Sequence, residues 1–196
     1  DRKMNSAKTV KQAASGTSVL EKAIAFRGRH GAERPIAPEA GMHCILNPMD
    51  VVQMLQEAGE SDPFLLAAAM LHDMLHFGAV TETDIASVFG SEVGSIVAEV
   101  TDNPRLSRST QKALRITIAP NMSRRAKLLK LAQLVASVRN LATPTPPAPW
   151  DEKQRNDFFD WVEKFSAATG VQNPTLQAIM LAELERARLE TIASSR

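Results

Sequence analysis

The chain contains little of what marks several classes of protein. It has one cysteine in 196 residues, Cys44, which excludes an internal disulfide framework and a cysteine-based zinc site. Its net charge is +1, so no overall basic surface for nucleic acid is expected. No apolar run approaches the roughly 18 residues that a membrane helix needs, and no secretory segment is evident at the start. These absences predict a cytoplasmic protein that binds neither a membrane nor nucleic acid.

What is present favours a helical protein. Hydrophobic residues make up 44% of the chain, enough for one compact core. Nearly every segment carries apolar residues at helical spacing, and neither strand pairs nor solenoid repeats stand out. We therefore predict an all-α fold, a single compact multi-helix bundle over residues 18–196 that follows a flexible tail over residues 1–17. The expected helices cover residues 18–30, 48–58, 62–76 (the most apolar, expected to be central), a short stretch after 81–84, 91–100, 124–141, 150–168 and 174–192.

Capping residues and prolines mark several of these helix ends. Asn47 and Asp62 each precede a proline and are good N-caps, and Thr81 with Asp84 forms an acidic variant of a capping box. The proline-rich stretch "ATPTPPAP" over residues 142–149 ends the helix before it. We expect this stretch to be an extended surface loop within one domain.

The stretch "LHDMLHFG" carries the first candidate chemistry. His72 and His76 are four residues apart and so share a face of the expected helix, with Asp73 beside His72. Such a face could hold a divalent cation. The alternative is that His72 is packed in a polar pocket, where Asp73 fixes its tautomer.

Five stretches in one order resemble the HD-domain metal-dependent phosphohydrolases. The similarity is greatest to the small alarmone hydrolases, relatives of the Rel/Spo hydrolase domain, which remove the 3′-pyrophosphate from ppGpp. The resemblance covers roughly residues 18–170 and implies an HD-type helical fold. The matching stretches are "HCILNP", "MLHDMLHF", "VFGSEVGSIVAEVTD", "AKLLKLAQLVASVRNL" and "PWDEKQRNDFFDW".

The resemblance also implies a metal site, which this sequence matches only in part. In the family, one divalent cation, usually manganese, is held by a His-Pro turn, a His-Asp pair and a later Asp. His72 and Asp73 match the pair, whereas the other two positions are Asn47 and Gln133. Amide oxygens are poor substitutes for imidazole and carboxylate at a transition metal. Asn47 and Gln133 are explained equally well as a helix cap and a helix-forming residue.

The remaining family site positions differ further. The family's catalytic Glu-Asp pair, which activates the attacking water, falls at His76 and Phe77. A catalytic role for His76 as a general base stays open, but phenylalanine accepts no proton. The nucleotide-contacting Asn falls at Ser137, while Arg139 matches. Nearby positive groups hold phosphates in the family, which nominates two further residues for this role, Arg34 and Lys130.

Two functions follow from this resemblance. The first is a catalytically impaired pseudo-hydrolase that keeps the binding of a phosphorylated guanine nucleotide or of a protein partner. The alternative is an active metal-dependent nucleotide phosphohydrolase with a rearranged ligand set, in which His30 and His43 join the histidines above. We favour the first, because five substitutions fall in one pocket and the Glu-Asp pair is lost. The metal content of protein purified without chelators would discriminate between the two hypotheses.

Overall fold

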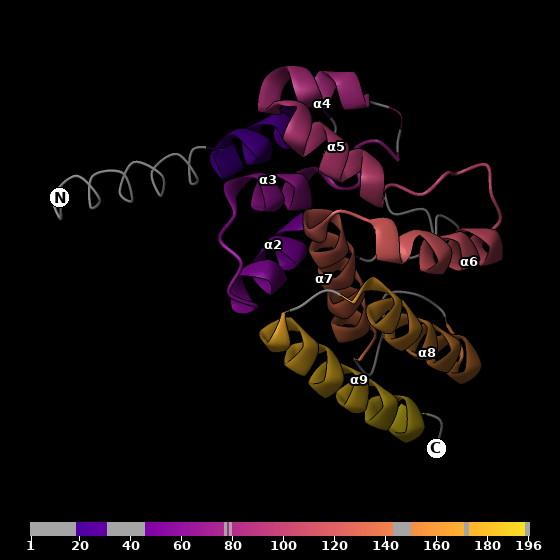
Figure 1. Ribbon diagram of the computed structural model, residues 1–196. Coiled ribbons are helices and arrows are strands. Elements are labelled where there is room, and N and C mark those ends of the chain that lie inside the picture. The colour runs from indigo at the N-terminus through magenta and orange to yellow at the C-terminus, as the bar shows by residue number, and fades with distance from the viewer. Residues whose placement is uncertain are drawn as a thin grey trace, which may run out of the picture.

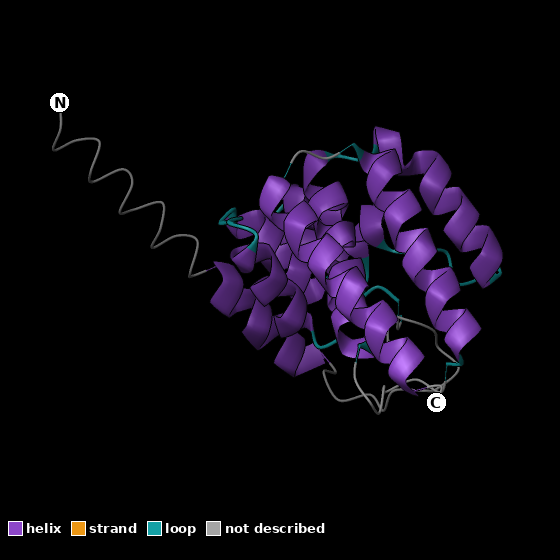
Figure 2. Ribbon diagram, turned by 90° about the horizontal axis from the view of Figure 1, so that it is seen from below, coloured by secondary structure: helices purple, strands orange, loops and turns teal. Residues whose placement is uncertain are grey.

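The chain folds as a bundle of helices. The computed structural model describes residues 19–30, 46–76, 78, 80–142, 150–170 and 173–194. Over these residues Figure 2 shows helices joined by loops and no strand, which confirms the all-α fold. A first helix covers residues 19–30. The others are α2 (Pro48–Glu57), α3 (Pro63–Leu71), α4 (Glu82–Phe89), α5 (Ser91–Val100), α6 (Arg108–Ile118), the 3₁₀ turn η2 (Ala119–Asn121), α7 (Arg124–Leu141), α8 (Glu152–Thr169) and α9 (Pro174–Ser194).

Helix α7 is the centre of the bundle. It contacts α2, α3 and α5 on one side and α8 and α9 on the other, as its position in Figure 1 shows. Its side chains are buried almost all round, including Leu128, Leu129 and Leu131. Residues 62–76 were expected to be central, and α3 is indeed buried on every side from Leu65 to Leu71. It contacts α2, α5 and α7, while α8 and α9 cover the other side of α7.

The predicted caps hold the helix starts. The Asn47 side chain accepts a hydrogen bond from the backbone N–H of Met49 at 3.0 Å, and Asp62 accepts one from Phe64 at 3.0 Å. Thr81 and Asp84 form the expected capping box. Each bond satisfies a backbone donor that the first helical turn would otherwise leave unpaired.

Helix α3 ends earlier than we predicted, at Leu71. From there the backbone N–H groups of Met74, His76 and Gly78 each bond to the carbonyl three residues back. Such bonds give about three residues per turn, so residues four apart no longer share a face. The expectation that His72 and His76 lie on one helix face is therefore wrong.

Helix α6 was not among the predicted helices. Its sequence, "RSTQKALRITI", is polar on average, and Ser107 caps it by accepting from the N–H of Thr110 at 3.2 Å. The helix packs beside α8 and carries several of the basic side chains described below.

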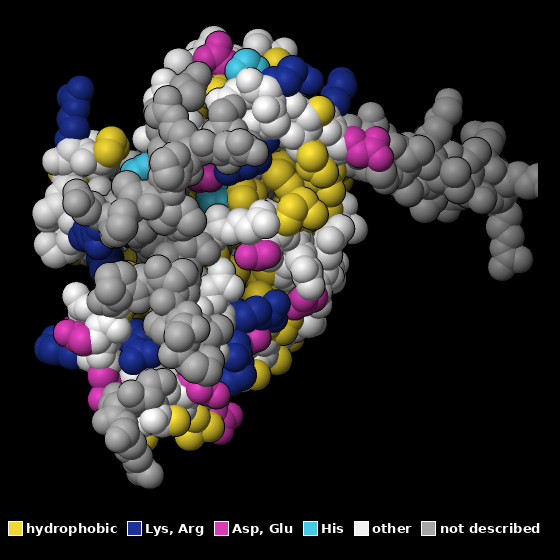
Figure 3. Space-filling view, turned by 180° about the vertical axis from the view of Figure 1, so that it is seen from behind, with side chains coloured by type: hydrophobic (Ala, Val, Ile, Leu, Met, Phe, Trp, Pro, Cys, Tyr) yellow, Lys and Arg dark blue, Asp and Glu magenta, His cyan; other side chains and the backbone are white. Residues whose placement is uncertain are grey.

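The surface carries charges of both signs. On the face shown in Figure 3, Lys and Arg side chains are interspersed with Asp and Glu and do not form one basic patch. Within the described part of the chain, every helix is too short or too polar to serve as a membrane span.

Candidate functional site

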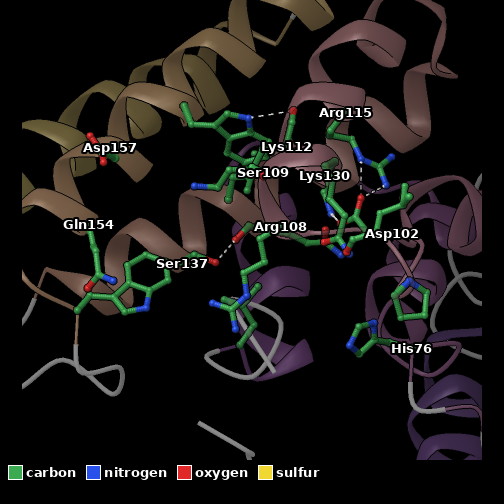
Figure 4. Close-up of a pocket in the computed structure, with 18 residues that line it drawn as sticks. His76, Asp102, Arg108, Ser109, Lys112, Arg115, Lys130, Ser137, Gln154 and Asp157 are labelled. Carbon is green, nitrogen blue, oxygen red and sulfur yellow. Dashed lines mark hydrogen bonds and ion pairs between the residues drawn. The ribbon is translucent and has the colours of Figure 1, made fainter. Parts of the chain in front are cut away.

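A cavity of about 540 Å³ opens where α6, α7 and α8 meet, and we call it the α6–α8 pocket. This volume is within the usual range for small-molecule sites. Figure 4 shows His76 and Asp102 at one end of the pocket and Gln154 and Asp157 at the other. The lining residues are Leu46, His76, Asp102, Pro104, Leu106, Arg108, Ser109, Gln111, Lys112, Arg115, Lys130, Gln133, Leu134, Ser137, Trp150, Gln154, Asp157 and Trp161.

Two buried cations share one carboxylate at the His76 end of the pocket. Arg115 donates from Nε and Nη2 to Asp102 Oδ1 at 3.1 and 2.5 Å, and Lys130 Nζ donates to Asp102 Oδ2 at 3.1 Å. Burial lowers the pKa of Lys130, and the Arg115 charge adds to this against the opposing effect of Asp102. One carboxylate neutralises only one of the two cations, so this end of the pocket is electropositive.

Further along α6, Lys112 lies against aromatic rings of α8. Lys112 Nζ lies 5.6 Å from the ring centroid of Trp161 and 5.8 Å from that of Phe158, within cation–π range. The indole N–H of Trp161 donates to the Lys112 carbonyl at 3.2 Å, which fixes α8 against α6. Burial also lowers the pKa of Lys112.

The residues that line the pocket include an unusual amide, that of Gln133. Both side-chain polar atoms of Gln133 are buried and lack a hydrogen-bond partner in the protein. The Ser137 hydroxyl does not reach this amide, because it donates to the Gln133 backbone carbonyl at 2.9 Å. Buried polar groups are almost always paired, so an unpaired amide in the lining of a pocket marks Gln133 as a candidate ligand contact.

His72 and Asp73 lie beside the pocket but do not line it. His72 Nδ1 donates to the carbonyl of Ala69 at 2.7 Å, so this carbonyl sets the tautomer. The expectation that Asp73 does so was wrong, because both Asp73 oxygens accept from Arg27. Arg27 Nη2 donates to Oδ2 at 2.9 Å, and Nη1 donates to Oδ1.

Burial and charge set the protonation of this pair. Burial lowers the pKa of His72, so the ring is neutral and its buried Nε2 has no partner. Burial of Asp73 opposes ionisation, but the hydrogen bonds from Arg27 and the charge of its guanidinium outweigh it. The pKa of Asp73 is therefore below its ordinary value, and the carboxyl is ionised.

The residues present do not fit the divalent-metal site that the family resemblance implies. Asn47 Oδ1 is used by the helix cap, and both oxygens of Asp73 are used by Arg27. His72 Nε2 and the Gln133 amide are left, which is too few strong donors for a transition metal. Over the described residues, no three His, Cys, Asp or Glu side chains gather in a metal-binding arrangement.

The other predicted site residues are distributed as follows. His76, Lys130, Gln133 and Ser137 line the pocket together. Arg139 does not line it, because its guanidinium is paired with Glu57 at 3.0 Å and Glu183 at 2.7 Å. His30 packs on the ring of Phe26, with centroids 4.3 Å apart. Arg34, His43 and Phe77 lie outside the described residues.

Sequence reasoning missed many of the pocket residues as site candidates, among them Asp102, Arg108, Lys112, Arg115 and Trp161. Three of these five belong to the unpredicted helix α6. The available signal was the spacing of Arg108, Lys112 and Arg115, which are four and three residues apart and so share one face of a helix.

Comparison with known proteins agrees with this architecture. A model of the HD domain family matches residues 30–156. The guanosine-3′,5′-bis(diphosphate) 3′-pyrophosphohydrolase MESH1 of Xenopus tropicalis is 35% identical over 74% of this chain and 81% of its own length. The Homo sapiens MESH1 is 35% identical over 73% and 79%.

Solved structures give the same result. A metazoan ortholog of SpoT that hydrolyzes ppGpp superposes with a TM-score of 0.71 and 28% identity, covering 88% of this chain and 95% of that one. The lmo0812 protein of Listeria monocytogenes shares the fold, with a TM-score of 0.61 and 20% identity over 72% of this chain and 98% of that one.

Proposed function

The chain belongs to the HD domain family, among the relatives of the small ppGpp hydrolases, and from this premise we propose that it is a pseudo-hydrolase. It binds a phosphorylated guanine nucleotide in the α6–α8 pocket and does not carry out the metal-dependent hydrolysis. The observation that carries this proposal is the contrast between the two halves of the site. The binding half has a charged and aromatic cavity, while two of the four metal-half residues, Asn47 and Asp73, are engaged by the protein itself.

The composition of the pocket supports an anionic, ring-containing ligand. Its lining has four Lys or Arg residues against two Asp, so the balance of charge is positive. A low-dielectric wall strengthens the attraction of these cations for phosphate. Trp150 and Trp161 give the pocket flat apolar surfaces on which a base or a sugar can pack. A pyrophosphorylated nucleoside combines both features, and the MESH1 relatives are named for such a substrate.

The replacement of the family's reacting groups supports the loss of hydrolysis. His76 lines the pocket at the position of the family's Glu, and the other member of that catalytic pair is Phe77. The ionised Asp73 is held by Arg27, and neither Asn47 nor Gln133 brings a charge that would attract a cation. Water activation by the family's route therefore lacks both its base and its metal ligands.

Binding and hydrolysis are tested separately with ppGpp. Calorimetry measures the binding of ppGpp to the wild type. EDTA is present at about 1 mM, which removes trace metal. The double variant Arg108→Ala, Lys112→Ala removes two pocket cations, and Lys164→Ala on the exposed side of α8 is the control for lost charge. We expect saturable binding that the double variant weakens at least about tenfold, as two lost charge-assisted contacts imply, and that Lys164→Ala leaves unchanged.

Hydrolysis is measured by chromatography of ppGpp incubated with protein and excess Mn²⁺, with His72→Ala, Asp73→Ala as the matched control for contaminating hydrolase. We expect no release of GDP and pyrophosphate above this control. Turnover that the control variant abolishes would contradict the pseudo-hydrolase and establish the alternative, an active phosphohydrolase with a rearranged ligand set. The absence of both binding and turnover would refute ppGpp as the ligand of the pocket.

A further inference from the structure

The geometry of Asp73 points to an internal replacement of the metal: we infer that the guanidinium of Arg27 serves as the cation of this site and keeps it closed to divalent metal ions. The inference deepens the proposed function, because it gives a physical reason for the loss of metal chemistry. It is tested with metal alone. The inference can therefore fail while the proposed nucleotide binding holds, and nucleotide binding can fail while the inference holds.

The Arg27–Asp73 pair is formed by the packing of two separate helices. Arg27 is on the helix over residues 19–30, and Asp73 follows the end of α3, 46 residues later. The guanidinium reaches both carboxylate oxygens, and its Nη1 also donates to the carbonyl of Met70 at 3.4 Å. This two-point geometry fits the planar guanidinium and would not be reproduced by lysine.

The Arg27–Asp73 pair is buried, so the carboxylate must be neutralised by a positive charge close to it. The side chain of Asp73 is 6% exposed and that of Arg27 is 17% exposed. A carboxylate in such surroundings needs a positive partner, and a divalent cation or a guanidinium can each fill that need. Both cannot do so together, because a metal bound to Asp73 would lie within a few ångströms of the Arg27 charge and be repelled by it.

His72, next to Asp73 in the chain, offers a second metal ligand. Its Nδ1 carries the proton, because the Ala69 carbonyl can only accept, and so Nε2 presents a lone pair. That lone pair is buried and has no partner in the protein. Removal of Arg27 would release the carboxylate of Asp73, the residue next to His72 in the chain. A carboxylate and an imidazole are ligand types that suit Mn²⁺ and similar ions.

The test measures Mn²⁺ binding from the loss of the electron paramagnetic resonance signal of the free ion, with no nucleotide present. The variants are Arg27→Ala and Arg27→Gln, and the matched control is Arg29→Ala, two residues on and exposed. We expect the wild type and Arg29→Ala to bind Mn²⁺ only weakly, with dissociation constants of about 1 mM or more, as for a site without enough charged donors. Either Arg27 variant should bind at least about tenfold more tightly, because the like charge is gone.

The gain must also depend on Asp73. Arg27→Gln combined with Asp73→Asn should lose the added affinity. Stoichiometric Mn²⁺ binding by the wild type that Asp73→Asn abolishes would overturn the inference. So would Arg27 variants that bind no more tightly than the wild type. If Arg27→Ala fails to fold, Arg27→Gln, which keeps the stem of the side chain, and the wild-type measurement still decide the question.

Discussion

Replacement of Gln133 by methionine tests whether the pocket lining is built for a ligand at the expense of stability. Both polar atoms of the Gln133 amide are buried without a partner, and Gln133 as a whole is 3% exposed. A buried amide without hydrogen bonds costs about 1–3 kcal/mol relative to an apolar group of similar shape. Methionine has a similar length and flexibility and packs in irregular spaces. We therefore expect Gln133→Met to raise the free energy of unfolding by about 1–2 kcal/mol.

The assay is equilibrium unfolding in urea, with the slope of the transition checked for change. The control is Gln111→Met in the same pocket, because the Gln111 amide donates to the carbonyls of Asn103 at 2.8 Å and Leu106 at 3.1 Å. Losing these bonds should cost about 1 kcal/mol. A Gln133→Met protein as stable as the wild type, or less stable, would refute the reasoning, since it would mean that the amide is satisfied in the free protein. Weaker ppGpp binding by a more stable Gln133→Met protein would show that the amide serves the ligand.

Three further predictions follow from the site and its supports. The pKa of Lys112 is lowered by burial, so nucleotide affinity should fall as the pH rises towards 10.5, the ordinary lysine value, and Lys112→Arg should move this loss to higher pH in calorimetric titrations. Asp102→Asn removes the shared partner of two buried cations and should cost about 3 kcal/mol in urea unfolding, whereas Asp157→Asn at the exposed end of the pocket should cost under about 0.5 kcal/mol. Asn47→Ala should cost about 1 kcal/mol in the same assay, as expected for loss of a helix cap, and a variant as stable as the wild type would contradict the capping role.

The parts of the fold marked by local chemistry could be predicted from the sequence. Asn47 with Pro48, and Thr81 with Asp84, define helix starts through contacts within four residues, and the structure forms these contacts. Helix α7 and the two closing helices were also predicted within a few residues of their bounds. Their ends depend on proline and capping residues, which act through the backbone regardless of what packs nearby.

The parts that depend on packing could not be predicted in this way. The apolar run before His72 predicts a longer helix, yet α3 gives way to tighter turns at Leu71 and the two histidines separate. Helix α6 carries local signals, its cap Ser107 and the spacing of its basic residues, but its place in the pocket depends on packing, because the ring of Trp161 that meets Lys112 comes from 49 residues away. The Arg27–Asp73 pair carries no local signal, because its residues meet only when separate helices dock.

The substitutions in the metal half of the site are coupled through charge. With Asn47 and Gln133 as neutral amides, Asp73 would be a buried carboxylate without a strong metal site to neutralise it, and such a charge is costly. Arg27 removes that cost by binding both oxygens. Once Arg27 is in place, histidine at 47 or aspartate at 133 would not suffice to rebuild a metal site, because the guanidinium still holds Asp73 and repels the ion. The two amides and Arg27 therefore fit together. Metal-dependent chemistry would return only if Arg27 were replaced and strong ligands were restored at positions 47 and 133.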